Sequence, residues 1–543
     1  MSTQSEINRS ARSAALEAVS RLPMESTSLI DYQSQGRMVI IGDNQAWEVA
    51  PRLVGRLNTL LILTEGVEEP GVPLVPLGGR SIHIEGYLGN FRIQLGEAGK
   101  PNAESVAADL VLDLGPEPLI SSQIRPPGYR HASFEEEDLE SAMAELSELT
   151  GRFEKPRYFN YDPDICAHSH AGKTACTRCL DACPADAISS LGEHIEVNPY
   201  LCQGGGVCAT VCPSGAIQYA YPRPHDNLTR LRRLLSVYRE EGGVEPVLLV
   251  VAESDETAPD LNQEPTQDNH LPFRVEELAS VGLDFWLSAL AYGARRVLLV
   301  DYGAMPESSG QALAQQLVYA REILSAMGYA ERAIQLLKGE QLADTIEPDT
   351  GMPDIDPAGY SGLGGKRKTA FLAIDHLHAQ ATRAKPLATL STGAPFGSAD
   401  VDAQACTLCF SCVGACPGKA LQTGGEEIPQ LHFIEENCLQ CGMCTRTCPE
   451  DAIWITPRLV FDAQARQQKR KLHEEQPFCC TACGKPFATR SVINNMMQKL
   501  QGHYMFQTER ARRRLTLCED CRVVDIVQDQ EAMIQGMDDQ IRQ

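Results

Sequence analysis

The sequence predicts a multidomain protein of the α+β and α/β classes. With 543 residues, the chain is too long for a single hydrophobic core. Two stretches alternate strand and helix patterns, and this alternation predicts two small α/β units. A short cysteine–proline signature occurs four times, so we expect one cysteine-rich module to be present twice.

The N-terminal part is predicted to hold a helical segment and the first α/β unit. Residues 1–35 are expected to form a loosely held helix, followed by a small α/β domain over 36–125. The elements of this domain follow from its apolar runs: strand 37–43, helix 44–56, strand 59–66, a hairpin over 81–96 and strand 108–115. A proline-rich exit and an acidic helix then form a predicted linker over 126–160.

The second α/β domain is predicted over 223–345. Its expected elements, in order, are helix 227–241, strand 246–252, a polar loop over 253–269, helix 275–292, strand 295–303 and helix 310–327. Gly328 stands where a C-terminal cap belongs. We expect both α/β units to be Rossmann-like, and a Gly- and Pro-rich linker over 346–395 to follow the second one.

Cysteine usage points to metal binding. The 20 cysteines fall into three groups, at 166–212, 406–448 and 479–521. No export signal is visible, and cytosolic thiols are kept reduced, so a disulfide framework is not expected. Cys183, Cys212, Cys416 and Cys448 are each followed by proline and define the repeated signature.

The second cysteine module, predicted over 396–460, carries two complete iron–sulfur motifs. Three cysteines at x2 intervals hold one cube, and a fourth, followed by proline, crosses to the neighbouring cluster. The spacing predicts two [4Fe–4S] ligand sets: Cys406, Cys409, Cys412 and Cys448; and Cys438, Cys441, Cys444 and Cys416. Zinc knuckles are the alternative, but they lack the third cysteine and the Cys-Pro ending. The module is therefore expected to be ferredoxin-like.

The first cysteine module, predicted over 161–222, departs from this spacing in both halves. In its first half Lys173 occupies a cysteine position, and the more distant Cys166 can supply the thiolate if the intervening loop bulges out. His168 and His170 in that loop are the alternative ligands. The predicted set for a third [4Fe–4S] cluster is Cys166, Cys176, Cys179 and Cys212.

In the second half of this module Gly205 stands where the middle cysteine belongs. Three thiolates remain, on Cys183, Cys202 and Cys208. This set predicts a [3Fe–4S] cluster or a [4Fe–4S] cluster that lacks one protein thiolate, and an empty site is the alternative. Because thiolate number changes cluster charge, we expect this module to have reduction potentials of its own.

The C-terminal domain, predicted over 461–543, contains two Cys-x2-Cys pairs. Cys480, Cys483, Cys518 and Cys521 predict a tetrahedral site for Zn²⁺, or for iron of the rubredoxin type, in a zinc-ribbon-like module. Cys479 is not expected to be a ligand. Seven cations give this region a basic character that suits either an acidic partner or a solvated face: Lys469, Arg470, Lys471, Arg510, Arg512, Arg513 and Arg514.

Charge and hydropathy exclude several function classes. The formal net charge of −24 argues against a nucleic-acid partner and against an anionic membrane surface. No stretch approaches the roughly 20 apolar residues of a membrane span. The charged N-terminus does not resemble a secretory signal. We therefore expect a cytoplasmic protein with neither nucleic-acid binding nor membrane insertion.

Nucleotide and catalytic motifs are weak. The turn after strand 37–43 has one glycine and lacks G-x-G-x-x-G. The segment GLGGKRKT (362–369) fails the phosphate-loop pattern because Arg367 follows Lys366. Whether either α/β unit binds flavin or nucleotide stays open. No catalytic residues stand out, so we do not expect a substrate site of the chain's own.

The motifs resemble a family of large bacterial 4Fe–4S ferredoxin-type proteins associated with molybdenum- or tungsten-dependent formate dehydrogenases. The resemblance rests on ICAHS and CTRCLDACPADAI, on LCQGGGVCATVCPSGAI, and on CTLCFSCVGACPGKAL with CLQCGMCTRTCPEDAI. It implies electron exchange with a redox protein partner, for which a formate dehydrogenase is the expected candidate. The middle α/β unit also resembles the delta-type subunit of hydrogenase–heterodisulfide reductase systems but lacks its cysteines.

These observations favour an iron–sulfur electron-transfer protein that relays electrons between a redox enzyme and another carrier. Two alternatives remain. One is an accessory or maturation protein for a molybdoenzyme, suggested by the C-terminal cysteine site. The other is a flavin-containing oxidoreductase subunit.

Overall fold

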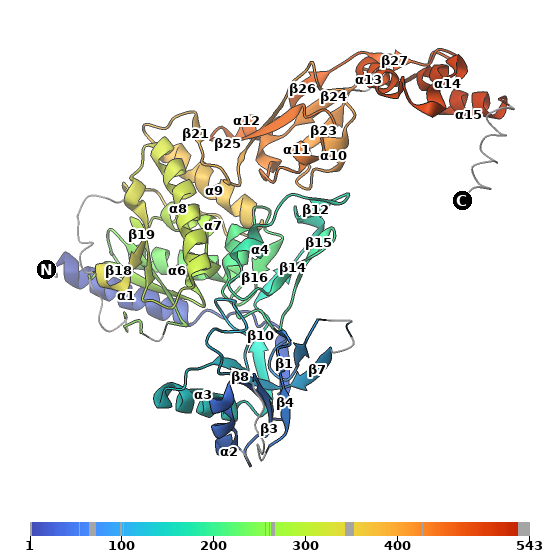
Figure 1. The fold of residues 1–543 in the computed structure, drawn as a ribbon. Helices are drawn as coiled ribbons and strands as arrows, with labels where there is room; N and C mark the ends of the chain where they lie inside the picture. Colours follow the sequence, from blue (N-terminus) through green and yellow to red (C-terminus); the bar gives the residue numbers. More distant parts are fainter. Residues whose placement is uncertain are drawn as a thin grey trace. The chain divides into compact units, whose positions relative to one another are not determined.

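The fold is described from a computed structural model of the chain (Figure 1). It describes residues 3–53, 55–64, 72–97, 100, 103–255, 257–259, 261, 267–342, 352–425 and 427–529. Contacts divide the chain into two compact units: Met1–Pro163 with Thr177–Ala384, and Asp164–Cys176 with Lys385–Gln543. The architecture is mixed α/β and multidomain.

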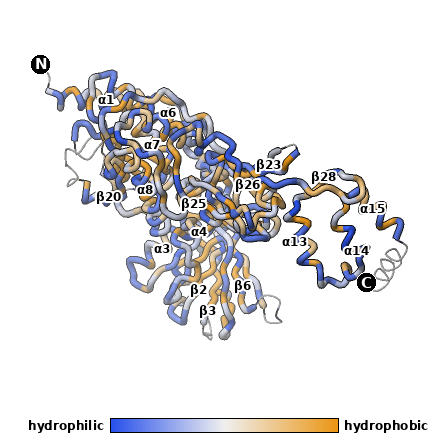
Figure 2. Tube along the Cα trace, turned by 90° about the horizontal axis from the view of Figure 1, so that it is seen from above, coloured by the Kyte–Doolittle hydropathy of each residue, from blue (hydrophilic) through white to orange (hydrophobic). Residues whose placement is uncertain are grey.

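The first unit begins with a parallel five-stranded sheet of order β4-β3-β2-β8-β9. Its strands are β2 (Arg37–Gly42), β3 (Asn58–Leu63), β4 (Leu74–Pro76), β8 (Leu110–Asp113) and β9 (Tyr129–His131). The apolar runs of β2, β3 and β8 are almost wholly buried, and the strands predicted there are confirmed. Figure 2 shows hydrophobic residues along β2 and β3. Residues 65 and 66 of the predicted strand 59–66 lie outside the described residues.

Around this sheet the local structure differs in detail from the expected elements. The predicted helix 44–56 is a short 3-10 turn, η1 (Asn44–Glu48), followed by one helical turn, α2 (Ala50–Leu53). The predicted hairpin is present and belongs to an antiparallel sheet of β5 (Ile82–Glu85), β6 (Phe91–Leu95) and β7 (Glu104–Ala108). Helix α3 (Glu136–Glu148) buries Leu139 and Leu146. β1 (Leu29–Ser34) pairs with β10 (Gly151–Pro156).

The second parallel sheet has the order β18-β17-β19-β20. Its strands are β17 (Val247–Ala252), β18 (His270–Val275), β19 (Arg296–Asp301) and β20 (Ile334–Lys338). Every residue of β17 and β19 is buried. β18 lies largely in the gap between the predicted loop 253–269 and the predicted helix 275–292, where no strand is expected from the sequence, and the helix begins only at Leu283. The strand contains Pro272. At the edge of a sheet a strand tolerates proline, since one side of it has no pairing partner.

The same α/β domain contains three helices beside this sheet: α6 (Pro224–Glu240), α7 (Leu283–Ala291) and α8 (Glu307–Met327) (Figure 1). Gly328 ends α8 at φ +83°, as the cap prediction requires. Two further helices pack on these: α1 (Gln4–Ser20) on α6, and α9 (Lys366–Gln380) on α7. α9 forms inside the range predicted as a linker, 346–395, and residues 346–351 at the start of that range lie outside the described part.

The two cysteine modules are built from the same parts. In the first module β11 (Phe159–Tyr161) pairs with β16 (Ile217–Tyr219), and β14 (Ile188–Leu191) with β15 (His194–Val197). In the second, β22 (Gly397–Val401) pairs with β25 (Ile453–Val460), and β23 (Leu421–Gly424) with β24 (Gln430–Phe433). Each module adds two short helices: α4 (Arg178–Ala182) and α5 (Val207–Val211), or α10 (Ser411–Gly414) and α11 (Met443–Thr447).

The second unit also contains a small hairpin and the C-terminal region. The hairpin joins β12 (Ser169–His170) to β13 (Lys173–Thr174). β21 (Leu387–Thr389) and β26 (Arg470–Glu474) extend the sheets of the second module. The remaining elements are α12 (Ala463–Gln467), β27 (Pro477–Cys479), β28 (Pro486–Thr489), α13 (Arg490–Leu500), α14 (Glu509–Arg513) and α15 (Glu519–Val527). Among the described residues, none of the helices has the length and apolarity needed to span a bilayer.

Candidate metal centres

The four cysteine–proline signatures share one backbone turn. The third residue after each cysteine has a positive φ: Asp186 (47°), Gly215 (77°), Lys419 (52°) and Asp451 (49°). In the second module the amide that follows this turn donates to the cysteine sulfur, from Ala420 to Cys416 and from Ala452 to Cys448, both over 3.3 Å. The turn thus directs a hydrogen-bond donor at a sulfur, which stabilises a thiolate ligand.

The second module brings together the first predicted crossed set. Cys406, Cys409 and Cys412 line one small cavity, and Cys448 from the far end of the module reaches the same cavity. Apolar side chains such as Leu431 complete its wall. Among its cysteines, Cys409 is exposed. This set is therefore open to solvent at one corner.

The second predicted crossed set lines a neighbouring cavity. Cys438, Cys441 and Cys444 meet Cys416 there. The Gln440 side-chain amide donates to Cys438 Sγ over 3.2 Å and to the Ser398 carbonyl over 3.0 Å. These contacts hold the loop at Gln440 in place and give the Cys438 sulfur a hydrogen-bond donor.

Electrostatics of these thiols suit a cationic occupant. Burial, reinforced by Cys406 and Cys409, raises the pKa of Cys412 to about 12. Burial also raises the pKa of Cys441 to about 12, with a further contribution from Cys416. Such crowded thiols lose their protons when metal ions take up the negative charge. The donor set therefore fits an iron–sulfur cluster at each cavity.

In the first module Cys183, Cys202 and Cys208 lie close enough to act on one another, and Cys179 also acts on Cys208. Burial raises the pKa of Cys208 well above its ordinary value, and Cys202 and Cys183 add to this effect. Burial likewise raises the pKa of Cys202 and of Cys183. All three cysteines lie in the first unit and interact electrostatically, as a shared site requires.

Gly205 occupies the turn of an iron–sulfur loop even though it offers no sulfur. Positive φ angles flank it at Gly204 (83°) and Gly206 (70°). Similar pairs flank the middle cysteines of the second module: Leu408 (53°) and Phe410 (59°) around Cys409, and Gln440 (52°) and Gly442 (78°) around Cys441. The backbone of the complete motif is retained at Gly205, and only the ligand is missing.

The displaced Cys166 lies in the segment 164–176, which belongs to the second unit. Cys179 and Cys212 belong to the first unit. The four-thiolate set proposed for these cysteines therefore stays a prediction. Of the alternative ligands, His168 is buried and its Nδ1 lies 2.9 Å from the carbonyl oxygen of Cys176. His170 is exposed on the β12–β13 hairpin.

That hairpin, expected only as a bulging loop, contacts the second module within the same unit. Lys173 Nζ donates to the Arg446 carbonyl over 2.6 Å, and Arg446 Nη1 donates to the Thr174 carbonyl over 2.8 Å. Arg446 lies on α11, the helix that carries Cys444. Cys176 is close enough to Cys441 to influence its pKa. The hairpin therefore places Cys176 beside the Cys441 site.

The C-terminal cysteines form the most compact ligand group. The sulfurs of Cys480, Cys483, Cys518 and Cys521 all lie within 4.8 Å of one another. Burial acts to raise the pKa of Cys480, but amides of Cys518, Cys483 and Ala482 donate to its sulfur and hold its pKa at about 6. Cys479 is exposed and outside the group. The arrangement suits one tetrahedral metal ion.

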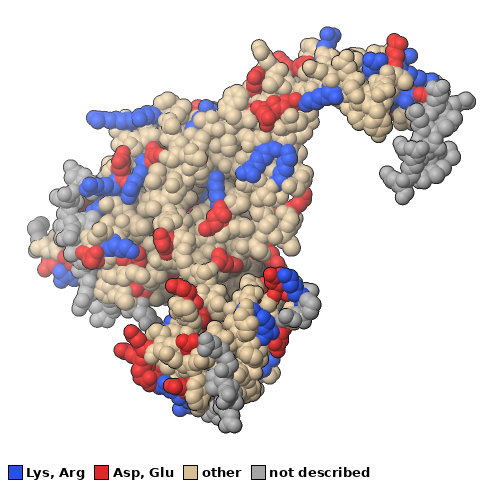
Figure 3. Space-filling model, in the orientation of Figure 1, with Lys and Arg blue, Asp and Glu red and all other residues tan. Residues whose placement is uncertain are grey.

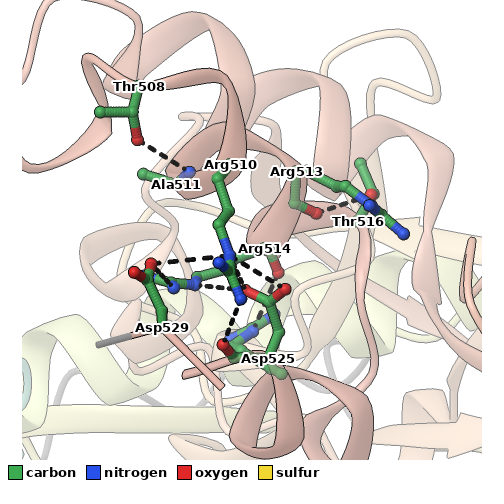
Figure 4. Close-up of polar contacts among 9 residues, drawn as sticks. Thr508, Arg510, Ala511, Arg513, Arg514, Thr516, Asp525 and Asp529 are labelled. Atoms are coloured by element: carbon green, nitrogen blue, oxygen red, sulfur yellow. Dashed lines mark hydrogen bonds and ion pairs between the residues drawn. The ribbon is translucent and has the colours of Figure 1, made fainter. Parts of the chain in front are cut away.

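Much of the basic character of the C-terminal region is neutralised within the chain. Arg510 and Arg514 form ion pairs with Asp525, which lies on α15, and with Asp529, which follows this helix (Figure 4). Arg470 pairs with Asp400 over 2.6 Å. Figure 3 shows basic and acidic side chains next to each other in this part of the chain. These ion pairs favour a solvated, structural role for Arg470, Arg510 and Arg514.

Two lysines that the sequence pattern did not single out as site residues lie beside the first module. Lys155 Nζ donates to the carbonyls of Tyr200 and Cys202 over 3.0 and 2.7 Å, and burial lowers its pKa to about 8. Lys366 Nζ contacts the carbonyl of Cys212 over 3.0 Å. Lys366 also lines a cavity of about 270 Å³ formed by α5, β16 and the first turns of α6, α7 and α9.

The fold of the cysteine modules and their paired ligand sets define 4Fe–4S ferredoxin-type domains. The 4Fe-4S dicluster domain family matches residues 405–452, and the 4Fe-4S binding domain family matches residues 195–218.

Among curated proteins, the chain is 40% identical over 62 residues to hydrogenase-4 component A of Escherichia coli K12, covering 11% of this chain and 28% of the relative. It is 31% identical over 64 residues to formate hydrogenlyase subunit 2 of the same organism, covering 12% and 29%. It is 37% identical over 57 residues to an uncharacterized ferredoxin of Methanocaldococcus jannaschii, covering 10% and 31%. The chain thus spans about three tenths of the length of these relatives.

Proposed function

We propose that this chain is an iron–sulfur electron-transfer protein that relays single electrons between a redox enzyme and another carrier. The observation that carries the proposal is the pair of cavities in the second module. Each is lined by three closely spaced cysteines and by one that crosses from the other motif. This crossed arrangement serves two adjacent clusters.

The residues assigned to the clusters divide into four sets. Two [4Fe–4S] sets belong to the second module: Cys406, Cys409, Cys412 and Cys448; and Cys438, Cys441, Cys444 and Cys416. A third comprises Cys166, Cys176, Cys179 and Cys212. The fourth, Cys183, Cys202 and Cys208, is proposed to hold a [3Fe–4S] or incompletely ligated [4Fe–4S] cluster. Bound clusters supply one-electron oxidation and reduction, and their potentials respond to charge and hydrogen bonds.

An electron route between the modules is supported by the β12–β13 hairpin. Its contacts with Arg446 keep Cys176 beside the Cys441 site within one unit. We propose that the Cys176 cluster exchanges electrons directly with the Cys441 cluster. The unusually long spacing between Cys166 and Cys176 provides the residues that form this hairpin.

The proposed partner is a redox enzyme of the formate dehydrogenase or hydrogenase type. Support comes from the printed names of the relatives, hydrogenase-4 component A and formate hydrogenlyase subunit 2. The net charge of −24 agrees with a protein partner rather than nucleic acid. The same proposal includes a cytoplasmic location, Zn²⁺ at the Cys480 group, Rossmann-like character of the two parallel sheets and the eight domains and linkers expected from the sequence.

The decisive experiment is metal and sulfide analysis of anaerobically purified protein, combined with EPR during a redox titration. We expect about 15 iron atoms per chain, from three cubes and one [3Fe–4S] cluster, and one zinc. Colourless, iron-free protein would refute the electron-transfer function. Co-purification with an active dehydrogenase supports a relay, whereas exclusive association with immature apoenzyme supports an assembly role instead.

A further inference from the structure

Lys366, the first residue of α9, lies at the C-terminal end of the short helix α5. Its Nζ donates to three backbone carbonyls: Ala209 over 2.6 Å, Thr210 over 2.5 Å and Cys212 over 3.0 Å. α5 carries Cys208, and Cys212 follows its last residue. A cation from α9 is therefore bound between Cys208 and Cys212, two predicted cluster ligands.

The hydrogen bonding indicates that Lys366 carries its charge. An ammonium group has three hydrogens, and three carbonyls accept from it, whereas a neutral amine would leave one of them without a donor. Burial lowers the pKa of Lys366, and the carboxyl of Asp284 acts against this effect. Asp284 lies in the first turn of α7, on the wall of the same cavity.

The position of Lys366 is unfavourable for α9 itself. A cation in the first turn of a helix opposes the helix dipole, which favours acidic side chains there. The N-cap, Gly365, has no side-chain cap, and the first turn of α9 contains no acidic residue. The carbonyls at the end of α5 supply the negative partial charge that Lys366 lacks on its own helix. The charge of Lys366 therefore stabilises the C-terminal end of α5 in the cysteine module and not the first turn of α9.

The close approach of the two segments fixes this geometry. Gly215 lies in the turn after Cys212 with φ +77°, and a side chain there would meet Lys366 Cβ at 3.2 Å.

We propose that Lys366 is a positioning residue that raises the reduction potential of the cluster bound by Cys212. This inference rests on the proposed function, since it requires a cluster at that cysteine. Reduction adds one negative charge to a cluster, and a fixed cation close to a ligand stabilises the reduced form. The three carbonyls hold the charge at a fixed position beside Cys212.

The test compares Lys366→Gln with the wild-type chain. Glutamine keeps an amide donor for the carbonyls but removes the charge. We expect the equilibrium constant for reduction of the Cys212 cluster to fall about tenfold, a shift of 59 mV to lower potential for one electron. Potentials are measured by EPR-monitored redox titration, and one cysteine variant in each module assigns the signals. Lys366→Arg, which retains the charge, is expected to restore most of the potential.

Lys368→Gln is the matched control, because Lys368 lies on the same helix with an exposed side chain. It should leave every potential unchanged, and the two clusters of the second module should not respond to either variant. An unshifted Cys212 potential in Lys366→Gln, with full iron content, would overturn the inference while leaving the electron-transfer function intact. If Lys366→Gln loses iron from the first module and Lys366→Arg loses it equally, Lys366 has only a structural role and the inference also fails. Wild-type protein without iron would instead refute the proposed function.

Discussion

Gly205 shows at the scale of one residue how a metal site can keep its backbone and lose a ligand. Its flanking residues keep the left-handed conformation found around Cys409 and Cys441. Glycine at 205 itself is not needed for this turn, because the positive φ angles belong to its neighbours. A cysteine at this position is therefore compatible with the local fold.

The Gly205→Cys variant is predicted to complete the cluster. Its Cβ would lie 3.5 Å from Pro184 Cγ and 3.9 Å from Ile124 Cδ1, which are ordinary contacts. We expect the [3Fe–4S] EPR signal of oxidised protein to disappear and the iron content to rise by about one atom per chain. Quantitative EPR and iron analysis measure both changes.

Gly204→Cys is the control for this substitution. A side chain at 204 would meet the Tyr158 ring at 2.9 Å, and its φ of +83° disfavours any residue with a Cβ. We expect this variant to lose stability and to gain no iron. A Gly205→Cys protein with the same EPR spectrum as the wild type would contradict the assignment of Gly205 to the missing ligand position.

Ligand residues differ in how far local sequence could identify them. The two sets of the second module follow from spacing, because each loop wraps its own site and only Cys416 and Cys448 cross over. Lys155 and Lys366 could not be found in this way. Their acceptors, the carbonyls of Cys202 and of Cys212, lie 47 and 154 residues away in the chain.

At the scale of elements, α1 is more tightly held than its sequence indicates. It packs along α6, and its small residues Ala11 and Ala15 are fully buried. The Asn8 side chain accepts a hydrogen bond from the Val244 amide over 3.0 Å, and Arg12 donates to the Gln267 carbonyl over 3.2 Å. The low hydrophobicity of the α1 sequence does not indicate this packing, because alanine allows close contact between helices without a large apolar side chain.

The Ala15→Glu variant tests this packing. A carboxylate at a fully buried position has no partner, so we expect the free energy of unfolding to fall by about 2 kcal/mol or more. Ser13→Glu, on the exposed face of the same helix, should have little effect. Urea unfolding of both variants, followed by tryptophan fluorescence, measures the difference. Equal stability of the two would show that α1 does not pack on α6 in solution.

His270 on β18 is expected to make the second α/β domain sensitive to acid. Burial, with smaller effects of Arg296 and Arg12, lowers the pKa of His270 to about 4. In the unfolded chain the histidine takes up its proton near pH 6.5. As the pH falls from about 6.5 to 4, the unfolded state binds more protons than the folded state, and stability is lost.

Between pH 7 and pH 5 this histidine should reduce the free energy of unfolding by roughly 2 kcal/mol. Urea unfolding at the two pH values, compared with His270→Gln, measures this contribution. The exposed His194 provides the control variant, His194→Gln, which shares any acid effect on the clusters. A wild-type pH dependence equal to that of His270→Gln would contradict the expectation.

At the scale of the whole molecule, the C-terminal region has little core of its own. Only Cys480, Leu517 and Cys518 form its described buried cluster, with Phe487 and Cys521 beside them. A module of this kind depends on metal binding for its folding, because the ligands gather only in the folded state. The ferredoxin-type modules have larger apolar surroundings, such as Leu431 and Phe433.

Removal of the C-terminal metal is therefore predicted to unfold this region alone. A zinc chelator, or the Cys483→Ser variant, should lower the helical circular dichroism and expose the region to proteolysis, while the visible absorption of the clusters persists. Cys479→Ser is the control, since Cys479 lies outside the ligand group. Loss of cluster absorption in parallel with zinc would show that the two regions do not fold independently.

The division of the chain into two units could not be read from the sequence. Segment 164–176 lies within the predicted first module, 161–222, but belongs to the same compact unit as residues 385–543. The contacts responsible are those of Lys173 and Thr174 with Arg446, more than 270 residues further on. The repeated modules themselves were predictable, because each is built from short local motifs.

The sequence by itself determined the repeated 4Fe-4S motifs, because it sets which thiols stand close together along the chain. Spacings of two or three residues restrict a loop to one turn, so local covalent geometry is sufficient for this. The tertiary structure alone decided which charges surround the sites, because Lys155, Lys366 and Arg446 reach them only through the packing of distant segments. That packing depends on the shape of the whole core, which no local pattern encodes.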